Sequence, residues 1–543
     1  MDFENKTPED LTSEDSQFTE LTEEEINAST VFSKPNIVNT KPKKKKTWLR
    51  IAIPLLSVIA VLLISLFLNQ KIGDKDTSST DSSTTTGETI TVLNLDEKDI
   101  KNVEFKSKSL DLTLYPTTDS DEILWYIKGI EKKYQDTEAT KNTVTDCINA
   151  VATIEREYNP NEDYGFDNPT ATALITTKEG KKISLEISDE YKKGALTGAY
   201  MRTSEAKDKI YILKDTQFES YDWSLTYYIN PKIPTAIKED KSNAEYFTDE
   251  LTGFDYFEFS GEIAAENYRF EMTDRENSSV KFKMVTPYVY NASTEAVEEF
   301  FNFAKTDMES YEVYAFNKNG LTAKELKKYG LDTPDATIKY KVGKDVVTIK
   351  VARTNIKGEE DFHAVIMNDI PIIYKVSKGT FSFLSYDYTK FVSSTLLAEN
   401  IIGMKNLTLN INGKTYKFDV KAKENDEAEI EAKIKYDGKN IDTNNFTEYY
   451  YRVLSICAYL SSDSLMQERP KDAEEYFTVT IGHNKTVKDK DITLKLYKLK
   501  GNSTRFYAEL DGNPVGLCDV KYANSVYKDI KKLINNAELS EID

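Results

Sequence analysis

The sequence predicts an α+β protein made of tandem repeats of antiparallel β-sheet with a packed helix, preceded by one transmembrane helix. The hexapeptide Tyr164-Gly165-Phe166-Asp167-Asn168-Pro169 recurs 165 residues later as Tyr329-Gly330-Leu331-Asp332-Thr333-Pro334, and alternating apolar and polar residues follow each copy. Such recurrence indicates a repeated structural unit, and the alternation is typical of strands with one buried face. Nearer the N-terminus, residues 51–68 form a stretch of 18 residues without a charge, which is long enough to cross a membrane.

The uncharged stretch at residues 51–68 is predicted to be the centre of a transmembrane helix at 48–70. At about 1.5 Å per residue it spans roughly 27 Å of hydrocarbon. A cleaved signal peptide is the alternative, but its apolar region is usually about 7–15 residues long and begins close to the N-terminus. Here a long segment precedes the stretch, and no clean small-x-small cleavage site follows it. We therefore expect an uncleaved anchor, whose first partner is the lipid bilayer.

Basic residues before the span predict its orientation. Four lysines at 43–46 and Arg50 precede it, whereas Lys71 and Lys75 follow it beside two aspartates. The positive-inside rule places the N-terminus in the cytoplasm and the region after the span outside the cell membrane. The lysine run could also attract anionic lipid headgroups, although a topology signal alone explains it.

Two segments beside the predicted helix have the composition of unfolded chain. Residues 1–47 are rich in Glu, Asp, Ser, Thr and Lys and poor in aromatic residues, so they bury too little apolar surface to offset the entropy lost on ordering. Residues 71–90 are rich in Ser, Thr and Asp and contain two glycines. We expect a disordered cytoplasmic segment and a flexible stalk that holds the folded region away from the membrane.

The region after residue 90 is longer than one ordinary domain of about 100–200 residues, and its pattern divides it into three units. The first unit, residues 91–235, is expected to open with strands within 100–115 and at 125–127. A helix beginning near Thr140 is expected to bury residues at spacings of three and four: Val144, Cys147, Ile148, Val151 and Ile154. Strands then follow at 171–177, 183–187, 199–203 and 209–213.

The second unit, residues 245–395, and the third, residues 396–543, repeat this order. In the second unit we expect strands near 256–260, 268–272 and 280–284, a helix from Ser293, and strands at 336–342, 346–351, 363–367 and 372–376. The third unit lacks the hexapeptide and is a less obvious copy. There we expect strands at 407–411 and 415–420 joined at Asn412-Gly413, a helix from Thr443 that turns Cys457 inward, and strands at 477–481, 492–498, 505–510 and 515–520.

The repeated hexapeptide is interpreted as a structural turn, formed by Tyr164, Gly165, Asp167 and Pro169 in one copy and by Tyr329, Gly330, Asp332 and Pro334 in the other. Glycine permits a positive φ, and proline directs the chain into an extended strand. The aspartate is expected to accept hydrogen bonds from amides two or three residues further on, and the tyrosine to pack the corner. Because such turns are ordinary, this interpretation is preferred over a ligand site.

A tryptophan-bearing strand, a helix, the Tyr-Gly-Leu/Phe-Asp-x-Pro turn and a following β-meander together resemble the bacterial DUF4340 domain over residues 92–392. The meander ends in a Tyr-x-Arg and Val/Ile-Tyr-x-Val/Leu pair, which the chain matches at Tyr200, Arg202, Ile210, Tyr211 and Leu213 and again at Ile373, Tyr374 and Val376. The second copy lacks the arginine, because His363-Ala364-Val365 occupies that strand. The resemblance implies an extracytoplasmic, membrane-tethered protein of a family whose function is unknown. Some of its members accompany ABC-type transporters or gliding-motility components, and it supplies no catalytic residues.

Residues that commonly bind metals or act as nucleophiles are few and scattered. The two histidines, His363 and His483, lie in separate units without a Cys or His neighbour at ligand spacing. Cys147, Cys457 and Cys518 form no CxxC pair. Cys147 and Cys457 occupy equivalent inward positions of their predicted helices and are interpreted as buried apolar side chains. A Cys457–Cys518 disulfide is the alternative outside the cell.

Other signatures of chemistry are also missing from the sequence. Glycine-rich phosphate loops are absent, and the acidic run at 425–431 lacks the spacing of a calcium loop, so we interpret it as a solvated hairpin edge. Carboxylates are too abundant for a glycosidase pair to be singled out. We expect no catalytic, cofactor-binding or metal-binding residue.

Charge and aromatic content bear on the partners. Residues 1–68 contain 10 acidic and 8 basic side chains, so −18 of the total charge of −20 falls after them. We therefore expect no nucleic acid as a partner. The 34 tyrosines cluster at 227–228, 288–290, 386–388 and 449–451. They favour strands, and the alternative is a binding face.

These observations predict a non-enzymatic accessory or scaffold protein that docks other envelope proteins, with ABC-type transporter subunits as candidate partners. Tandem sheets offer long edges and faces to a partner, whereas no cleft residues are nominated for catalysis. The alternative is a cell-surface module that binds a glycan or peptide ligand, and an enzyme is the third choice.

Overall fold

The computed structural model of the chain describes residues 89–542, except for 120–121, 194–195, 222, 236–253, 274, 306, 425–429, 466–467, 486 and 488. The predicted cytoplasmic segment, the span at 51–68 and nearly all of the stalk lie outside these residues. Within the described ranges, no helix is both long and apolar enough to cross a membrane. The prediction of mostly antiparallel sheets with few helices is confirmed: three large sheets make up this part of the chain.

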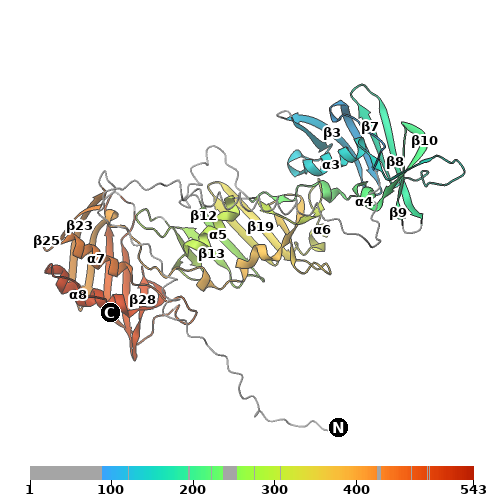
Figure 1. The fold of residues 1–543 in the computed structure, drawn as a ribbon. Coiled ribbons are helices and arrows are strands. Elements are labelled where there is room, and N and C mark those ends of the chain that lie inside the picture. The colour runs from blue at the N-terminus through green and yellow to red at the C-terminus, as the bar shows by residue number, and fades with distance from the viewer. Residues whose placement is uncertain are drawn as a thin grey trace, which may run out of the picture. The chain divides into compact units, whose positions relative to one another are not determined.

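The first sheet has eight strands, all paired with antiparallel neighbours. In pairing order they are β4 (Glu122–Ile127), β3 (Asp111–Asp119), β2 (Ile100–Ser107), β7 (Ala171–Thr177), β8 (Lys182–Lys193), β9 (Leu196–Thr203), β10 (Ala206–Lys214) and β6 (Ile154–Glu157). One helix, α3 (Thr137–Ile148), packs on one face of this sheet (Figure 1).

Helix α3 begins earlier and ends earlier than predicted. Asp136 caps it by accepting hydrogen bonds from the amides of Glu138 and Ala139, both at 3.0 Å, and a capping aspartate is the stronger start signal. The helix ends at Ile148. The two residues that were expected on its last turns therefore lie on strands: Val151 on β5 (Val151–Ala152) and Ile154 on β6.

The second sheet has nine strands and the same order of pairing around its centre. They are β15 (Tyr290–Asn291), β14 (Phe282–Thr286), β13 (Tyr268–Met272), β12 (Phe254–Gly261), β18 (Ala336–Val342), β19 (Asp345–Arg353), β20 (Phe362–Met367), β21 (Ile372–Ser377) and β17 (Glu312–Phe316). Helix α5 (Thr294–Lys305) packs on the core side. A short helix, α6 (Ala323–Lys328), leads into the second copy of the repeated turn and begins with a capping box between Thr322 and Glu325.

The third sheet has eight strands: β25 (Lys439–Ile441), β24 (Ile430–Tyr436), β23 (Lys414–Glu424), β22 (Met404–Ile411), β26 (Glu474–His483), β27 (Ile492–Leu499), β28 (Asn502–Leu510) and β29 (Asn513–Asp519). Helix α7 (Thr443–Leu454) packs on it, and its cap is Asp442. A second helix, α8 (Val520–Ile534), was not predicted. The last strand was expected to run through Val520, but Asp519 caps a helix there instead by accepting from the amide of Lys521.

The three β-rich repeats share one topology. In each, the opening strand pairs in the middle of the sheet with the first long strand after the helix, in the pairs β2–β7, β12–β18 and β22–β26. The chain that enters each repeat also pairs with the segment just after the helix: β1 (Ile90–Thr91) with β5, β11 (Lys232–Ile233) with β16 (Met308–Glu309), and Thr395 with Cys457. Cys457 thus lies beyond α7, not on its inward side as expected.

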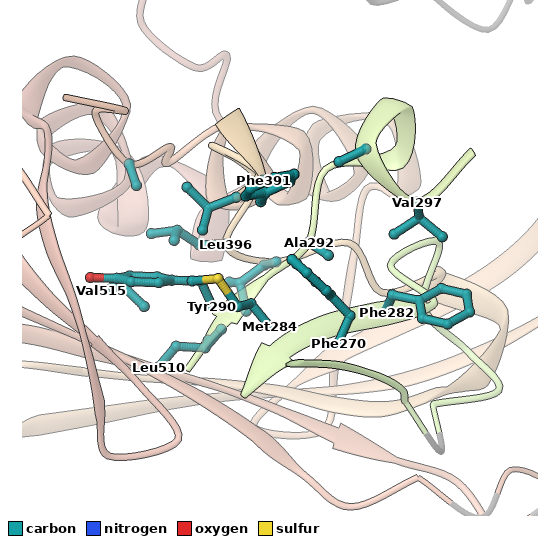
Figure 2. Packing of buried hydrophobic residues seen from close by; sticks show 14 of the residues in the cluster. Phe270, Phe282, Met284, Tyr290, Ala292, Val297, Phe391, Leu396, Leu510 and Val515 are labelled. Carbon is teal, nitrogen blue, oxygen red and sulfur yellow. The ribbon is translucent and has the colours of Figure 1, made fainter. Parts of the chain in front are cut away.

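Hydrophobic side chains between each sheet and its helix form the core. The first sheet has its own cluster, whereas one continuous cluster holds core residues of the second and third sheets. Figure 2 shows part of the shared cluster, where Phe270 and Met284 of the second sheet lie in the same group as Leu510 and Val515 of the third. The Phe257 ring stacks on Phe300 of α5 with centroids 4.3 Å apart. Each sheet therefore buries one face in the core, and its opposite face carries other side chains.

Candidate functional site

Each sheet has a helix face, which lies on the core, and an outer face on its other side. Side chains alternate between the faces along a strand. In β21, Tyr374 and Val376 belong to the core, whereas Ile373 belongs to a separate small cluster on the outer face and Lys375 points the same way. Both copies of the repeated turn contribute side chains to outer faces.

The first copy of the turn packs its aromatic residues on the outer face of the first sheet. Tyr164 and Phe166 cluster with Ile210 of β10 and with Tyr200 of β9, and the Tyr164 and Tyr200 rings meet edge to face with centroids 5.1 Å apart. Gly165 has a φ of 76°, a backbone conformation that glycine adopts more readily than residues with a Cβ. Pro169 leads into β7.

The second copy packs in the same manner on the second sheet. Tyr329 and Leu331 cluster with Ala364 of β20 and with Ile373, and the Tyr329 hydroxyl donates to the carbonyl oxygen of Tyr314 at 3.0 Å. Gly330 has a φ of 74°, and Pro334 leads into β18.

The aspartates of the turns are exposed. Asp167 and Asp332 both face solvent, and the carboxylate that accepts an amide hydrogen in the first copy is that of Asp163, which bonds the amide of Gly165 at 2.9 Å. In the second copy Asp335, which follows the turn, accepts from the backbone and guanidinium of Arg353. The turns therefore use neighbouring aspartates to position the chain.

Replacing Gly330 with alanine is expected to destabilise the second sheet by about 1–2 kcal/mol, because an L-residue pays for a left-handed conformation. Space is not the cause, since the added Cβ would meet the Ala352 Cβ at 3.4 Å. Hydrogen exchange of the β18 amides measures the loss. Gly379→Ala is the control, because the nearest atom to its added Cβ is 3.8 Å away. Equal effects of the two substitutions would contradict the conformational explanation.

A buried ammonium group dominates the outer face of the second sheet. The Lys375 side chain is only 8% exposed, and its Nζ donates to Glu312 at 2.8 Å and to Glu359 at 2.9 Å. Aromatic rings surround the same nitrogen at centroid distances of 4.6–5.6 Å: Tyr311, Tyr314 and Phe362. The Tyr314 hydroxyl donates to the other Glu359 oxygen at 2.6 Å. We call these six residues the Lys375 box.

The electrostatics of the Lys375 box favour the charged forms. Burial lowers the pKa of Lys375, but its hydrogen bonds to Glu312 and Glu359 outweigh that effect and leave the pKa raised. The hydrogen bonds from Lys375 and Tyr314 lower the pKa of Glu359. Burial, and then the bond to Glu359, raises the pKa of Tyr314. The box therefore keeps Lys375 charged between two carboxylates.

The other two outer faces combine the same kinds of group. In the first sheet, Arg202 donates to Glu186 at 2.6 and 2.9 Å and lies 4.5 Å from the Phe166 ring centroid. In the third, Arg469 donates to the Tyr497 hydroxyl at 2.8 Å, and that hydroxyl donates to Glu509 at 2.9 Å. In the sequence, Arg469 lies near the place that the hexapeptide occupies in the other two units. Each outer face thus carries an aromatic ring, a cation and a carboxylate in contact.

The two histidines lie on different sheets, whereas Cys457 and Cys518 lie on adjoining segments, since Ala458 pairs with Cys518 and the amide of Asp519 donates to the carbonyl of Cys457 at 3.2 Å. His363 lies on β20 and His483 at the end of β26, and burial lowers the pKa of His363. All three cysteines are free thiols, and burial raises the pKa of each, which opposes thiolate chemistry. Among the residues that the structure describes, no group of three or more His, Cys, Asp or Glu side chains is arranged to hold a metal ion.

The residues of the resemblance divide between the faces. Tyr200 and Arg202 lie on the outer face, whereas Tyr211 and Leu213 belong to the core. Sequence reasoning missed Lys375, Glu312 and Glu359. The only signal was a lysine inside the otherwise apolar strand Ile372-Ile373-Tyr374-Lys375-Val376, where every residue proves to be buried.

An open depression beside α7 offers weaker chemistry. It is lined by Asn440, Ile441, Asp442, Asn445, Asn536 and Glu538. Its polar groups already bond one another: the Asn536 side chain accepts from the amide of Asp442 at 2.8 Å and donates to the carbonyl of Asn440 at 3.2 Å. The Asn536 amide group therefore already has hydrogen-bond partners within the lining of this depression.

Comparison with protein families places one match within the chain. Residues 282–477 match the family described as Domain of unknown function (DUF4340). The match begins at β14 and ends in β26, so it includes the Lys375 box and the second copy of the turn but leaves out the first sheet. No curated protein and no solved structure matches the chain. The predicted resemblance is confirmed, with a position further along the chain than residues 92–392.

Proposed function

From the DUF4340 domain at residues 282–477, we propose that this chain is a non-enzymatic, extracytoplasmic protein that docks other envelope proteins. Its candidate partners are the subunits of an ABC-type transport system. In this proposal each sheet with its helix is one copy of a tandem repeat, and the uncharged stretch at 51–68 anchors the copies to the cell membrane in a single pass.

The outer faces carry the proposal. Each combines a tyrosine or phenylalanine ring with a lysine or arginine and a carboxylate, and aromatic residues and arginine are enriched in protein interfaces. The helices pack on the opposite faces, and exposed members of the outer faces, such as Tyr311 at 72%, lie where a partner can reach them. The charge of −18 after residue 68 supports protein partners over nucleic acid.

Crosslinking of the full chain in its native membrane, followed by purification and mass spectrometry, tests this proposal. We expect transporter subunits at amounts near those of the chain itself. A chain that lacks residues 48–70 is the control, because it should lose partners that require the membrane. Recovery of the protein alone, or with wall polymer, would contradict the docking function.

A second candidate function is glycan binding. Trp223, which is exposed, stacks on Tyr227 with centroids 4.3 Å apart and planes within 9°, and flat aromatic surfaces of this kind stack on sugar rings. A chain without its anchor should then retain glycan binding, and Trp223→Ala should abolish it. Retained binding in that variant would exclude this aromatic pair as the site.

A further inference from the structure

The Lys375 box shows that this face of the second sheet stabilises an ammonium group. Three rings within 5.6 Å of the Lys375 Nζ supply cation–π attraction, and two carboxylates supply charged hydrogen bonds at 2.8 and 2.9 Å. This ammonium belongs to Lys375 of β21, so it reaches the box from the sheet itself. On the solvent side of the box, Tyr311 again supplies a ring and Glu312 a carboxylate.

The outermost members of the box retain free surface. The Tyr311 ring is 72% exposed, although it contacts Phe362 with centroids 5.2 Å apart. The amide of Tyr311 donates to the carbonyl of Lys375 at 2.7 Å, which holds the backbone of Tyr311 beside β21. Glu312 bonds Lys375 through one oxygen, and its side chain is 53% exposed. An exposed ring and a carboxylate that uses one oxygen to bind Lys375 thus lie at neighbouring positions of the surface.

We call Tyr311 and Glu312 the rim of the Lys375 box. The segments beside this rim carry more acidic than basic side chains. The exposed acidic residues there are Asp307, Glu309, Glu312, Glu360 and Asp361, and the exposed basic ones are Lys232, Lys357 and Lys378, of which Lys232 pairs with Glu309 at 3.7 Å. Within the box, Lys375 has its charge matched by two carboxylates. A cationic partner therefore meets a complementary potential.

We propose that Tyr311 and Glu312 form a docking surface for a lysine- or arginine-bearing peptide segment of a partner protein. The inference deepens the proposed docking function and rests on it. A basic side chain of the partner lies against the outer face of the Tyr311 ring, and its charged end donates to the free oxygen of Glu312. It thereby repeats on the solvent side the contacts that Lys375 makes from within.

The test uses the full chain in phosphatidylcholine nanodiscs and a fluorescent decapeptide of alternating lysine and serine, with binding followed by anisotropy. We expect saturable binding that weakens as salt rises. Tyr311→Ala and Glu312→Gln should each raise the Kd at least threefold, and a decapeptide of alternating glutamate and serine should not bind. Tyr451→Ala is the matched control, because Tyr451 is also exposed but lies on α7.

The outcomes separate this surface from the docking function. Equal affinity of the wild type, Tyr311→Ala and Glu312→Gln would overturn the proposal and assign binding to general charge. A lack of binding by the wild type would also overturn it. Crosslinking from native membrane with the Tyr311→Ala chain gives the second readout. If partners are recovered equally with the variant and the wild type, docking stands and this surface is wrong. If neither recovers partners, the docking function itself fails.

Discussion

Replacing Arg452 with alanine is expected to destabilise the third sheet and its helices by about 3–5 kcal/mol, because the change removes the buried cation of Asp529 and leaves only Lys532, at 3.9 Å, beside this carboxylate. Arg452 of α7 is 4% exposed and Asp529 of α8 is 1% exposed. Their closest atoms, Nη1 and Oδ2, are 2.8 Å apart. The C-terminal segment joins the pair, since Ser540 donates to Asp529 from its amide and its hydroxyl at 2.7 Å. One substitution therefore loosens two helices and the chain end.

Hydrogen exchange of the α7 and α8 amides in the full chain measures this loss, because the chain has several cores and a single unfolding free energy is not defined for it. Glu448→Gln is the control. Its carboxylate also bonds Arg452 but is 57% exposed, so we expect a change below about 1 kcal/mol. The double variant Arg452→Met with Asp529→Leu should lose less than Arg452→Ala alone, since no charge remains buried. Equal exchange in Arg452→Ala and Glu448→Gln would contradict the assignment.

Replacing Lys375 with methionine is expected to destabilise the outer edge of the second sheet by about 2–3 kcal/mol, because two charged hydrogen bonds disappear. Methionine is unbranched and only one atom shorter than lysine, so most of the side-chain packing is retained. Hydrogen exchange of the β17 and β21 amides measures the change. Lys350→Met is the matched control, since Lys350 lies exposed on β19 of the same sheet, and its effect should be within about 0.5 kcal/mol.

The Lys375→Met effect should depend on pH with a defined sign. The pKa of Glu359 is lowered from 4.5, so its stabilisation is present above pH 4.5 and is lost as the pH falls through the lowered value. The pKa of Lys375 is raised from 10.5, so its stabilisation is lost only as the pH rises through the raised value. The difference between wild type and variant should therefore be constant at neutral pH and shrink on acidification. A difference that stays constant well below pH 4.5 would contradict the ion pairs.

Elements with strong local signals were predictable. Strand β18 runs over Ala336–Val342 as expected, with alternating buried and half-buried residues. Its apolar and polar residues alternate along the sequence, so consecutive residues alone indicate the strand. The hairpin at Asn412-Gly413 was also predictable, and both residues have positive φ. Boundaries where two local signals compete were harder. At α3, Asp136 outweighed the later threonine, and at α8 a capping aspartate ended a strand whose apolar residues continued into a helix.

The sequence by itself determined the strands, the repeated turn, the DUF4340 resemblance and the uncharged stretch, because each is set by residues close together along the chain. Only the tertiary structure decided which polar residues meet. Lys375 reaches Glu312 across 63 positions, and Arg452 reaches Asp529 across 77. Neither pair has a local pattern, since the partners come together only when strands and helices pack. The sequence alone thus supports a repeated β-rich chain, and the fold brings together the residues of the Lys375 box on an outer face.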